Sequence, residues 1–190
     1  MKTKIYIFRH SESTHNKSGV FSGRSEAKLS TYGKKKVQQI AQKLKNKKID
    51  LAFTSPLLRT RECLDYVLKY HPKTKIVVDM RLIERDYGKL TGKNKKEYAR
   101  KHPKLFPIYH RSYDVPPPGG ESMKQVDKRV SSFIKDMLKT IKEKKIKAVV
   151  IAGHGNSMRP IRKFFEGLDN EEMMKIESKK GEVFEYSINH

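Results

Sequence analysis

The run Ala148-Val-Val-Ile-Ala152 is the most apolar segment of the chain, and it restricts the fold more than any other feature. Five consecutive apolar residues, most of them β-branched, indicate a strand that is buried on both faces. Such strands belong to parallel sheets, in which helical crossovers cover the two sides. The segment therefore predicts a central strand of an α/β fold.

Other hydrophobic patterns place strands and helices in alternation along the chain. Further strands are predicted at residues 4–8, 51–54, 76–78 and 184–188. Helices are predicted from residue 31, after Ser55-Pro56 with Ser55 as N-cap, within 84–102, over about 121–144, and from 158 to 167. This order predicts a mainly parallel central sheet with helices on both faces, which is a three-layer α/β sandwich.

The charge of the chain bears on its partners. Lys and Arg number 43 against 21 Asp and Glu, which gives a net charge of +22 at pH 7. That excess favours anionic partners, although a solvated lysine-rich surface has the same composition. The basic clusters are dispersed and no nucleic-acid recognition motif is present. We therefore expect small anionic phosphorylated metabolites as partners, and neither nucleic acid nor membrane.

Cysteine usage and hydropathy indicate the compartment. Cys63 is the single cysteine, so no internal disulfide framework is expected. The apolar start at residues 5–8 is too short for the core of a signal peptide. We expect a cytoplasmic protein, and assembly into a homo-oligomer is compatible with the sequence.

Two histidines follow predicted strands that are far apart in the sequence. His10 comes directly after the strand at 4–8, and His154 follows the apolar run at 148–152. Ligands of such sheets bind at the carboxyl ends of the strands, so the fold can bring both imidazoles to one site. A neutral imidazole can attack phosphorus without first losing a proton. His10 is therefore the candidate nucleophile of a phosphoryl transfer.

Arginine is the side chain that best matches the oxygens of a transferred phosphoryl group, because its guanidinium donates a rigid fork of N–H groups. Arg9 precedes His10, and Arg59 lies one turn into the helix after Ser55-Pro56. For Arg59, a surface ion pair with Glu62 or Asp65 is an equally good interpretation.

A general acid and base must also protonate the leaving oxygen. Glu84, which follows the strand at 76–78 and its loop, is the candidate for this role. Asp86 is a rival for the same role.

The segment Arg9-His-Ser-Glu-Ser13 resembles the Arg-His-Gly-Glu-Ser signature of the histidine phosphatase superfamily. The resemblance continues in order over nearly the whole chain, through Phe21-Ser-Gly23, Leu29-Ser30, Thr54-Ser-Pro-Leu-Leu-Arg59, Glu84-Arg-Asp-Tyr-Gly88 and His154-Gly-Asn-Ser157. Within the superfamily the chain is similar to the cofactor-dependent phosphoglycerate mutases, through Glu84-Arg-Asp-Tyr-Gly-Lys-Leu-Thr-Gly-Lys-Asn-Lys-Lys-Glu97, Arg111-Ser-Tyr-Asp-Val-Pro-Pro-Pro118 and Ala152-Gly-His-Gly-Asn-Ser-Met-Arg159.

This resemblance implies one phosphoglycerate mutase-like domain over residues 1–190, with a small lid-like insertion around 84–120. It implies that His10 is phosphorylated, that Arg9, Arg59 and His154 form the phosphate pocket, and that Glu84 donates and accepts the proton. Substrate contacts are implied for Asn16, Ser22, Gly23, Tyr87, Lys95, Arg111 and Asn156. The implied reaction interconverts 2-phosphoglycerate and 3-phosphoglycerate, needs 2,3-bisphosphoglycerate as phosphoryl primer and uses no metal.

Several positions depart from the mutase pattern, and one of these departures favours an alternative function. Ser11 replaces the glycine of the signature, and His110 stands where mutases carry the first of two arginines. Arg24 and Glu26 replace the usual Trp and Asp. The junction before Glu121 is reduced to Pro-Gly-Gly. A shorter lid would admit water and favour hydrolysis of phosphohistidine, so the alternative is a phosphomonoesterase of the same superfamily.

Overall fold

The computed structural model describes residues 1–190, and a five-stranded sheet runs through its centre. The strand order is β3-β2-β4-β1-β5. Three pairs, β1–β4, β4–β2 and β2–β3, are parallel, and β5 is antiparallel to β1. The strands are β1 (Lys2–Arg9), β2 (Leu51–Thr54), β3 (Lys75–Val78), β4 (Ala148–Gly153) and β5 (Val183–Asn189). The predicted mainly parallel sheet is therefore confirmed, with β5 as its antiparallel edge.

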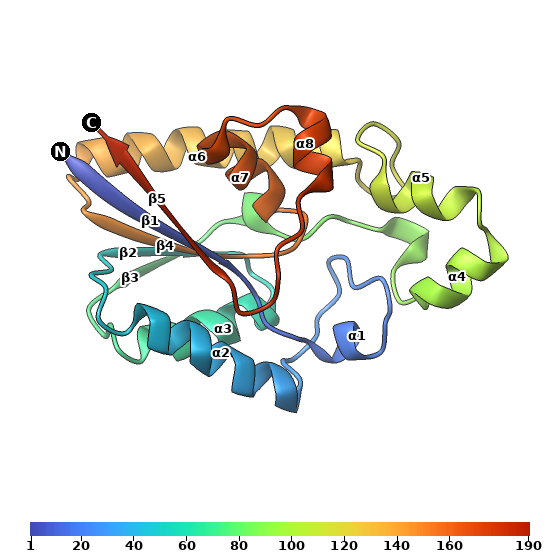
Figure 1. Ribbon diagram of the computed structural model, residues 1–190, viewed down its shortest axis with the longest axis horizontal. Coiled ribbons are helices and arrows are strands. Elements are labelled where there is room, and N and C mark those ends of the chain that lie inside the picture. Colours follow the sequence, from blue (N-terminus) through green and yellow to red (C-terminus); the bar gives the residue numbers. More distant parts are fainter.

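Two hydrophobic clusters, one on each face of the sheet, explain why helices cover both sides. Ile5 and Ile7 of β1 pack into the cluster that contains the apolar residues of α6. Tyr6 and Phe8, which alternate with them, pack with α2 and α3. Figure 1 shows α2 (Thr31–Leu44) and α3 (Leu58–Leu68) below the sheet, and α6 (Met123–Glu143), α7 (Met158–Glu166) and α8 (Asn170–Lys175) above it.

The longest helix, α6, matches its hydrophobic stripe closely. Ser122 is its N-cap and exchanges hydrogen bonds with Gln125 in a capping box, so the helix begins at Met123. The side chains on one stripe are buried, as predicted, and belong to the core. They are Met123, Val126, Val130, Phe133, Met137 and Ile141.

Short elements gather at the carboxyl ends of the parallel strands (Figure 1). They include α1 (Thr14–Lys17), η1 (Met80–Leu82), η2 (Gly88–Leu90), α4 (Lys95–Lys101) and α5 (Leu105–Arg111). The sequence did not predict α1, α5 or α8, because these helices of four to seven residues show no periodic apolar stripe. Their positions depend on capping and on packing against their neighbours.

The predicted start of α3 is wrong by two residues. The helix begins at Leu58, and Ser55 does not cap it. The carboxylate of Glu26, from the loop before α2, instead accepts a hydrogen bond from the Leu58 N–H at 3.0 Å. The Ser55 hydroxyl accepts a longer hydrogen bond from the Leu57 N–H, at 3.3 Å, and pairs with His154 Nε2 at 2.6 Å. A tertiary contact has therefore replaced the local cap.

The two chain ends lie side by side where β1 and β5 pair, and the His190 N–H donates to the Met1 carbonyl at 3.0 Å (Figure 1). None of the helices combines the length and the hydrophobicity that a membrane span requires.

Gly33 generates a prediction about how closely α2 packs against the loop after β1. A Cβ atom at this position would lie 2.0 Å from the Glu12 carbonyl oxygen. Alanine usually stabilises a helix relative to glycine, but here the steric overlap reverses the sign. Gly33→Ala should lower the free energy of unfolding by about 1–3 kcal/mol in urea titrations. Gln38→Ala, at an exposed position of the same helix, should change it by less than about 0.5 kcal/mol. Equal stability of the two variants would contradict this packing.

Candidate active site

His10 lies directly beyond the carboxyl end of β1, and its ring is buried. The main-chain N–H of His10 donates to the Gly153 carbonyl at 2.9 Å, which continues the pairing of β1 with β4. Its Nδ1 lies 2.6 Å from the Ser11 carbonyl oxygen. A carbonyl oxygen only accepts hydrogen bonds, so Nδ1 carries the proton and the neutral ring keeps its lone pair on Nε2. His10 is therefore held in the tautomer that a nucleophile requires.

Charge and burial keep this ring neutral. Burial is the largest cause that holds the pKa of His10 well below its ordinary value, and the cations Arg9 and Arg59 add to it. A protonated ring would have no lone pair with which to attack phosphorus. The surroundings of His10 thus favour the reactive form across the neutral pH range.

Arg59 is fully buried and is fixed by main-chain oxygens. Its two terminal nitrogens donate to the Ser25 and Gly23 carbonyls, each at 2.8 Å. Gly23 can present its carbonyl in this way because it adopts a φ of +49°, which other residues rarely do. The alternative ion pair is absent, because the Glu62 carboxylate accepts instead from the Leu29 N–H at 2.8 Å. Arg59 consequently keeps its full charge beside His10.

His154 follows β4 and lies against His10, with 5.1 Å between the ring centroids. Its Nε2 pairs with Ser55 Oγ at 2.6 Å, Ser55 Oγ with Thr60 Oγ1 at 2.8 Å, and Thr60 Oγ1 donates to the Leu57 carbonyl at 2.8 Å. The Leu57 carbonyl only accepts, so the Thr60 hydroxyl donates to it and the Ser55 hydroxyl donates to Thr60 Oγ1. His154 Nε2 must then carry the proton that it donates to Ser55 Oγ. Burial, followed by the charges of His10 and Arg59, lowers the pKa of His154.

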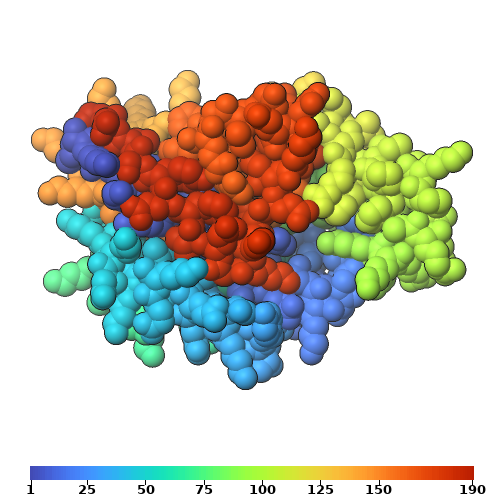
Figure 2. All heavy atoms as spheres, in the orientation of Figure 1, coloured from blue at the N-terminus to red at the C-terminus, as the bar shows by residue number.

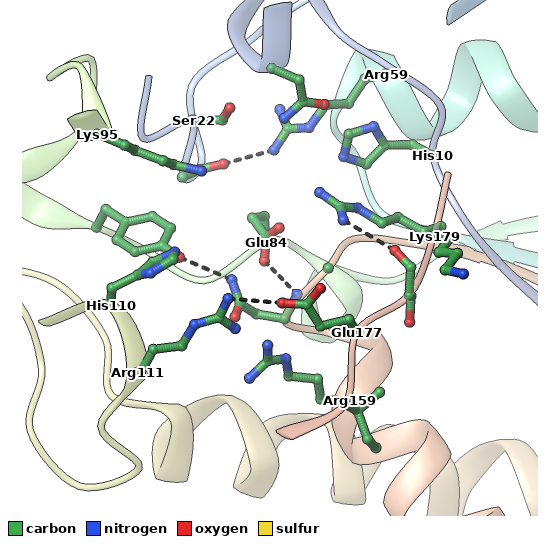
Figure 3. A pocket seen from close by; sticks show the side chains of 18 residues that line it. His10, Ser22, Arg59, Glu84, Lys95, His110, Arg111, Arg159, Glu177 and Lys179 are labelled. Atoms are coloured by element: carbon green, nitrogen blue, oxygen red, sulfur yellow. Dashed lines mark hydrogen bonds and ion pairs between the residues drawn. The ribbon is translucent and has the colours of Figure 1, made fainter. Parts of the chain in front are cut away.

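Three buried nitrogens around His10 have no hydrogen-bond partner. They are Arg9 Nε, Arg59 Nε and His154 Nδ1. Buried polar atoms without partners are rare in folded proteins, and at a functional site they indicate a missing ligand. Two of the three belong to guanidinium groups, so the ligand that fits is an anion. Figure 3 shows Arg59 and His10 together at one end of the cavity.

Glu84 and Asp86 have different surroundings, and the difference separates the two candidates for the proton-transfer role. Glu84 lines the cavity, and its Oε1 accepts from the main-chain N–H groups of Arg85 at 2.8 Å and Asn156 at 3.2 Å. Asp86 does not line it. The Asp86 carboxylate accepts from the Gly88 N–H at 2.8 Å and stabilises a turn. The geometry therefore favours Glu84.

A cavity of about 280 Å³ joins these groups to a second cationic region. In Figure 3 Glu84 lies between the end with His10 and Arg59 and the end with Arg111 and Arg159. Lys95 extends toward the same space from the start of α4. Figure 2 shows the surface hollowed between the red segment after α8 and the yellow-green residues of α4 and α5. The cavity can therefore accept a ligand with more than one anionic group.

The residues predicted to contact substrate come together at this cavity. Asn16, Ser22, Gly23, Tyr87, Lys95, Arg111 and Asn156 all line it. Of the five predicted catalytic residues, Arg9, His10, Arg59 and Glu84 line it as well. His154 lies behind His10, with no exposed surface. The roles of all twelve remain predictions, but the tertiary structure gathers them at one site.

Sequence reasoning missed the segment that follows α8. Glu177, Ser178 and Lys179 line the cavity, and Arg9 Nη1 donates to the Ser178 carbonyl at 3.3 Å. The only signal in the sequence is the basic pair that begins at Lys179, and such pairs are also typical of a solvated surface. Arg159 also lines the cavity, although the sequence analysis assigned it no contact. It ends the segment Ala152–Arg159 of the resemblance, so that motif could have revealed it.

Two departures from the mutase pattern are absorbed locally. Ser11 needs no positive φ, and its N–H donates to Cys63 Sγ at 3.2 Å, so a serine fits the backbone here. Arg24 forms ion pairs with Glu121 at 3.4 Å and with Asp86 at 3.9 Å. Neither substitution closes the cavity.

His110, a further departure, lines the cavity together with Arg111. Burial, together with the charges of Arg111 and Lys95, lowers the pKa of His110 to about 3. At neutral pH it therefore offers a ring N–H without positive charge, where mutases carry an arginine. Within the cavity, no group of three or more His, Cys, Asp or Glu side chains is arranged to bind a metal ion.

Comparisons with known sequences extend over the whole chain. A sequence model of the histidine phosphatase superfamily (branch 1) matches residues 5–190. A 2,3-bisphosphoglycerate-dependent phosphoglycerate mutase from Chelativorans sp. (strain BNC1) is 33% identical and aligns with 100% of this chain and 94% of the relative. A protein of the same name from Nitrobacter hamburgensis is 36% identical over 97% of this chain and 91% of the relative.

Solved structures share the fold at lower identity. The structure called Mycobacterial hydrolase 1 superposes with a TM-score of 0.88 at 18% identity, over 98% of this chain and 92% of that chain. A putative alpha-ribazole-5'-P phosphatase from Escherichia coli gives a TM-score of 0.85 at 19% identity, over 98% and 91%. These likenesses confirm the architecture.

The surroundings of His10 predict its titration. Because burial and two guanidinium groups disfavour the imidazolium, the Cε1 proton resonance of His10 should titrate well below the ordinary pKa of about 6.5 in NMR spectra. Saturating inorganic phosphate should move the midpoint upward, since an anion offsets the two cations. His10→Asn identifies the resonance. A midpoint at or above 6.5 without phosphate would contradict the arrangement.

Proposed function

The chain belongs to the histidine phosphatase superfamily, and we propose that it is a phosphoglycerate mutase that interconverts 2-phosphoglycerate and 3-phosphoglycerate through a phosphohistidine at His10. The observation that carries this proposal is the division of one cavity into two cationic regions. Arg9 and Arg59 surround His10, while Arg111 and Arg159 lie beyond Glu84. A phosphoglycerate carries a carboxylate as well as a phosphate, and so uses both regions.

The names of the sequence relatives support the same activity, because they are 2,3-bisphosphoglycerate-dependent mutases that align with almost the whole chain. The primer suits the cavity. Its phosphoryl group would pair with the unpartnered Arg9 Nε and Arg59 Nε, which belong to residues that line the cavity. When bound, 2,3-bisphosphoglycerate supplies the phosphoryl group that first loads His10.

The proposed transfer begins at His10 Nε2, whose lone pair is left free by the hydrogen bond from Nδ1 to the Ser11 carbonyl. Nε2 forms a bond to phosphorus while the ester oxygen leaves with its electron pair. Arg9 and Arg59 offset the charge on the three equatorial phosphoryl oxygens. His154 holds a proton at Nδ1 when the phosphoryl group is bound, because an adjacent anion favours the imidazolium. After this step the phosphoryl group is bound covalently to His10 Nε2.

Glu84 transfers the proton between the enzyme and the ester oxygen of the substrate. It protonates the departing ester oxygen, and it later accepts the proton of the substrate hydroxyl that takes the phosphoryl group from His10. The main-chain N–H groups of Arg85 and Asn156 hold its Oε1, which leaves the other carboxyl oxygen for this transfer. Because the two hydroxyls of the glycerate differ in position, the substrate must turn within the cavity between the two transfers.

A phosphomonoesterase is the second candidate function, and the shape of the lid favours it. Only residues 112–122 join α5 to α6, and Glu177 at the cavity mouth is exposed. Several proteins of similar fold are called phosphatases. In that reaction water would take the phosphoryl group from the same phosphohistidine. The two functions therefore share every step up to the choice of acceptor.

The proposal is tested by following the phosphoryl group. The protein is incubated with 3-phosphoglycerate and a trace of 2,3-bisphosphoglycerate, and we expect acid-labile phosphate on His10 and accumulation of 2-phosphoglycerate. His10→Ala should lower the rate by about 10⁴-fold or more, as loss of a covalent nucleophile does. Release of inorganic phosphate without 2-phosphoglycerate would contradict the mutase proposal and support the phosphatase. Absence of phosphohistidine would contradict both.

Two neighbouring carboxylates provide a matched test of the proton-transfer role. Glu84→Gln keeps the size of the side chain and removes its acid–base function, so kcat should fall by about 10²–10⁴-fold. Asp86→Asn makes the same chemical change outside the cavity, and kcat should stay within about threefold of the wild-type value. Circular dichroism would establish that both variants are folded. A larger loss of kcat in Asp86→Asn than in Glu84→Gln would reverse the assignment.

A further inference from the structure

Glu177 and Arg111 form an ion pair across the mouth of the cavity, with 3.1 Å between Glu177 Oε1 and Arg111 Nη2. Arg111 ends α5, while Glu177 follows α8, so the pair connects two segments that are 66 residues apart. Figure 3 shows the Glu177 carboxylate extending toward Arg111, with Arg159 close by. The only contact that fixes this carboxylate is with an arginine that a substrate would use.

The other carboxylate in the cavity differs in this respect. Glu84 is held by two main-chain N–H groups and does not depend on a cation of the site. Glu177 has 75% of its side chain exposed and no main-chain partner. Exposed ion pairs shift an equilibrium by no more than a few-fold. A carboxylate that enters the cavity can therefore displace Glu177 from Arg111.

We propose that Glu177 competes with the carboxylate of the substrate for Arg111 and so sets the affinity of the site for the substrate. It pairs with Arg111 in the empty cavity and releases Arg111 when a phosphate ester with a second anionic group binds. This inference rests on the proposed function, which assigns Arg111 to the substrate carboxylate. An ester with only its phosphate does not need Arg111 and leaves the pair intact.

Competition of this kind has a functional consequence. A cavity lined by several fixed cations would bind a multiply charged anion tightly, and uniform tight binding does not accelerate turnover. When product leaves, the Glu177–Arg111 ion pair forms again, and the free energy of this pair reduces the net affinity of the cavity for the product. The expected effect is on the dissociation constant, and it is confined to ligands that carry the second anion.

The experiment uses two ligands that differ in one group. 3-Phosphoglycerate has a carboxylate where glycerol 3-phosphate has a hydroxymethyl group. Dissociation constants are measured by titration calorimetry at fixed ionic strength, in a His10→Ala background that prevents phosphoryl transfer. We expect Glu177→Gln to tighten binding of 3-phosphoglycerate by about two- to fivefold. Binding of glycerol 3-phosphate should change by less than about 1.5-fold.

Two further variants separate competition from a general charge effect. Glu171→Gln removes the same charge from an exposed position of α8 and should leave both dissociation constants unchanged. In an Arg111→Ala background, Glu177→Gln should no longer affect 3-phosphoglycerate, because the contested group is gone. Weaker binding of 3-phosphoglycerate by Glu177→Gln, or equal tightening for both ligands, would overturn the inference.

The same measurements separate this inference from the proposed function. If no variant distinguishes 3-phosphoglycerate from glycerol 3-phosphate, Arg111 does not bind the carboxylate, and the mutase proposal loses its support together with the inference. If the carboxylate is preferred but Glu177→Gln leaves that preference unchanged, only the role of Glu177 is refuted. Neither result depends on catalytic turnover.

Discussion

Parallel pairing of β1 with β4 is the constraint on which the rest of the site depends. The two strands run in the same direction in adjacent positions, and Arg9 is opposite Gly153 in their register. Their carboxyl ends therefore coincide, and His10 and His154 leave the sheet side by side with ring centroids 5.1 Å apart. A shift of one residue would move one imidazole to the other face of the sheet, because side chains alternate along a strand. Burial of both strands between two helical layers prevents that shift.

The cations of the cavity are held in place largely by neutral oxygens. Arg59 donates to the Gly23 and Ser25 carbonyls, Arg9 to that of Ser178, and Arg159 to that of Met174 at 2.9 Å. A carbonyl orients a guanidinium without cancelling its charge, so the positive field remains available to an anion. Arg111 is the exception, since a carboxylate holds it. This contrast separates the three arginines that carbonyls hold, which keep their charge available, from Arg111, whose carboxylate partner a ligand can replace.

Choice of acceptor depends on parts of the molecule that lie outside the sheet. The two proposed functions would use the same sheet and the same first phosphoryl transfer to His10, so neither feature separates them. The segments that surround the end of the cavity away from His10 are α4, α5 and the segment that follows α8. His110 contributes an uncharged ring there, while Lys95 and Arg159 contribute cations. In the proposed mutase reaction, retention of the glycerate moiety during its turn depends on these contacts more than on the nucleophile.

The sequence by itself determined the layer architecture, and it identified the candidate nucleophile and most of the residues that line the cavity. Buried strands such as Ala148–Gly153 and the stripe of α6 are visible as patterns, because burial acts on every residue of a regular element. The tertiary structure alone decided which of Glu84 and Asp86 faces the cavity, and that Ser55 supports His154 instead of capping α3. It also brought Glu177 and Ser178 to the site. These side chains act through contacts between segments that are distant in sequence, and no local pattern records which partner a polar group will meet once the chain has folded.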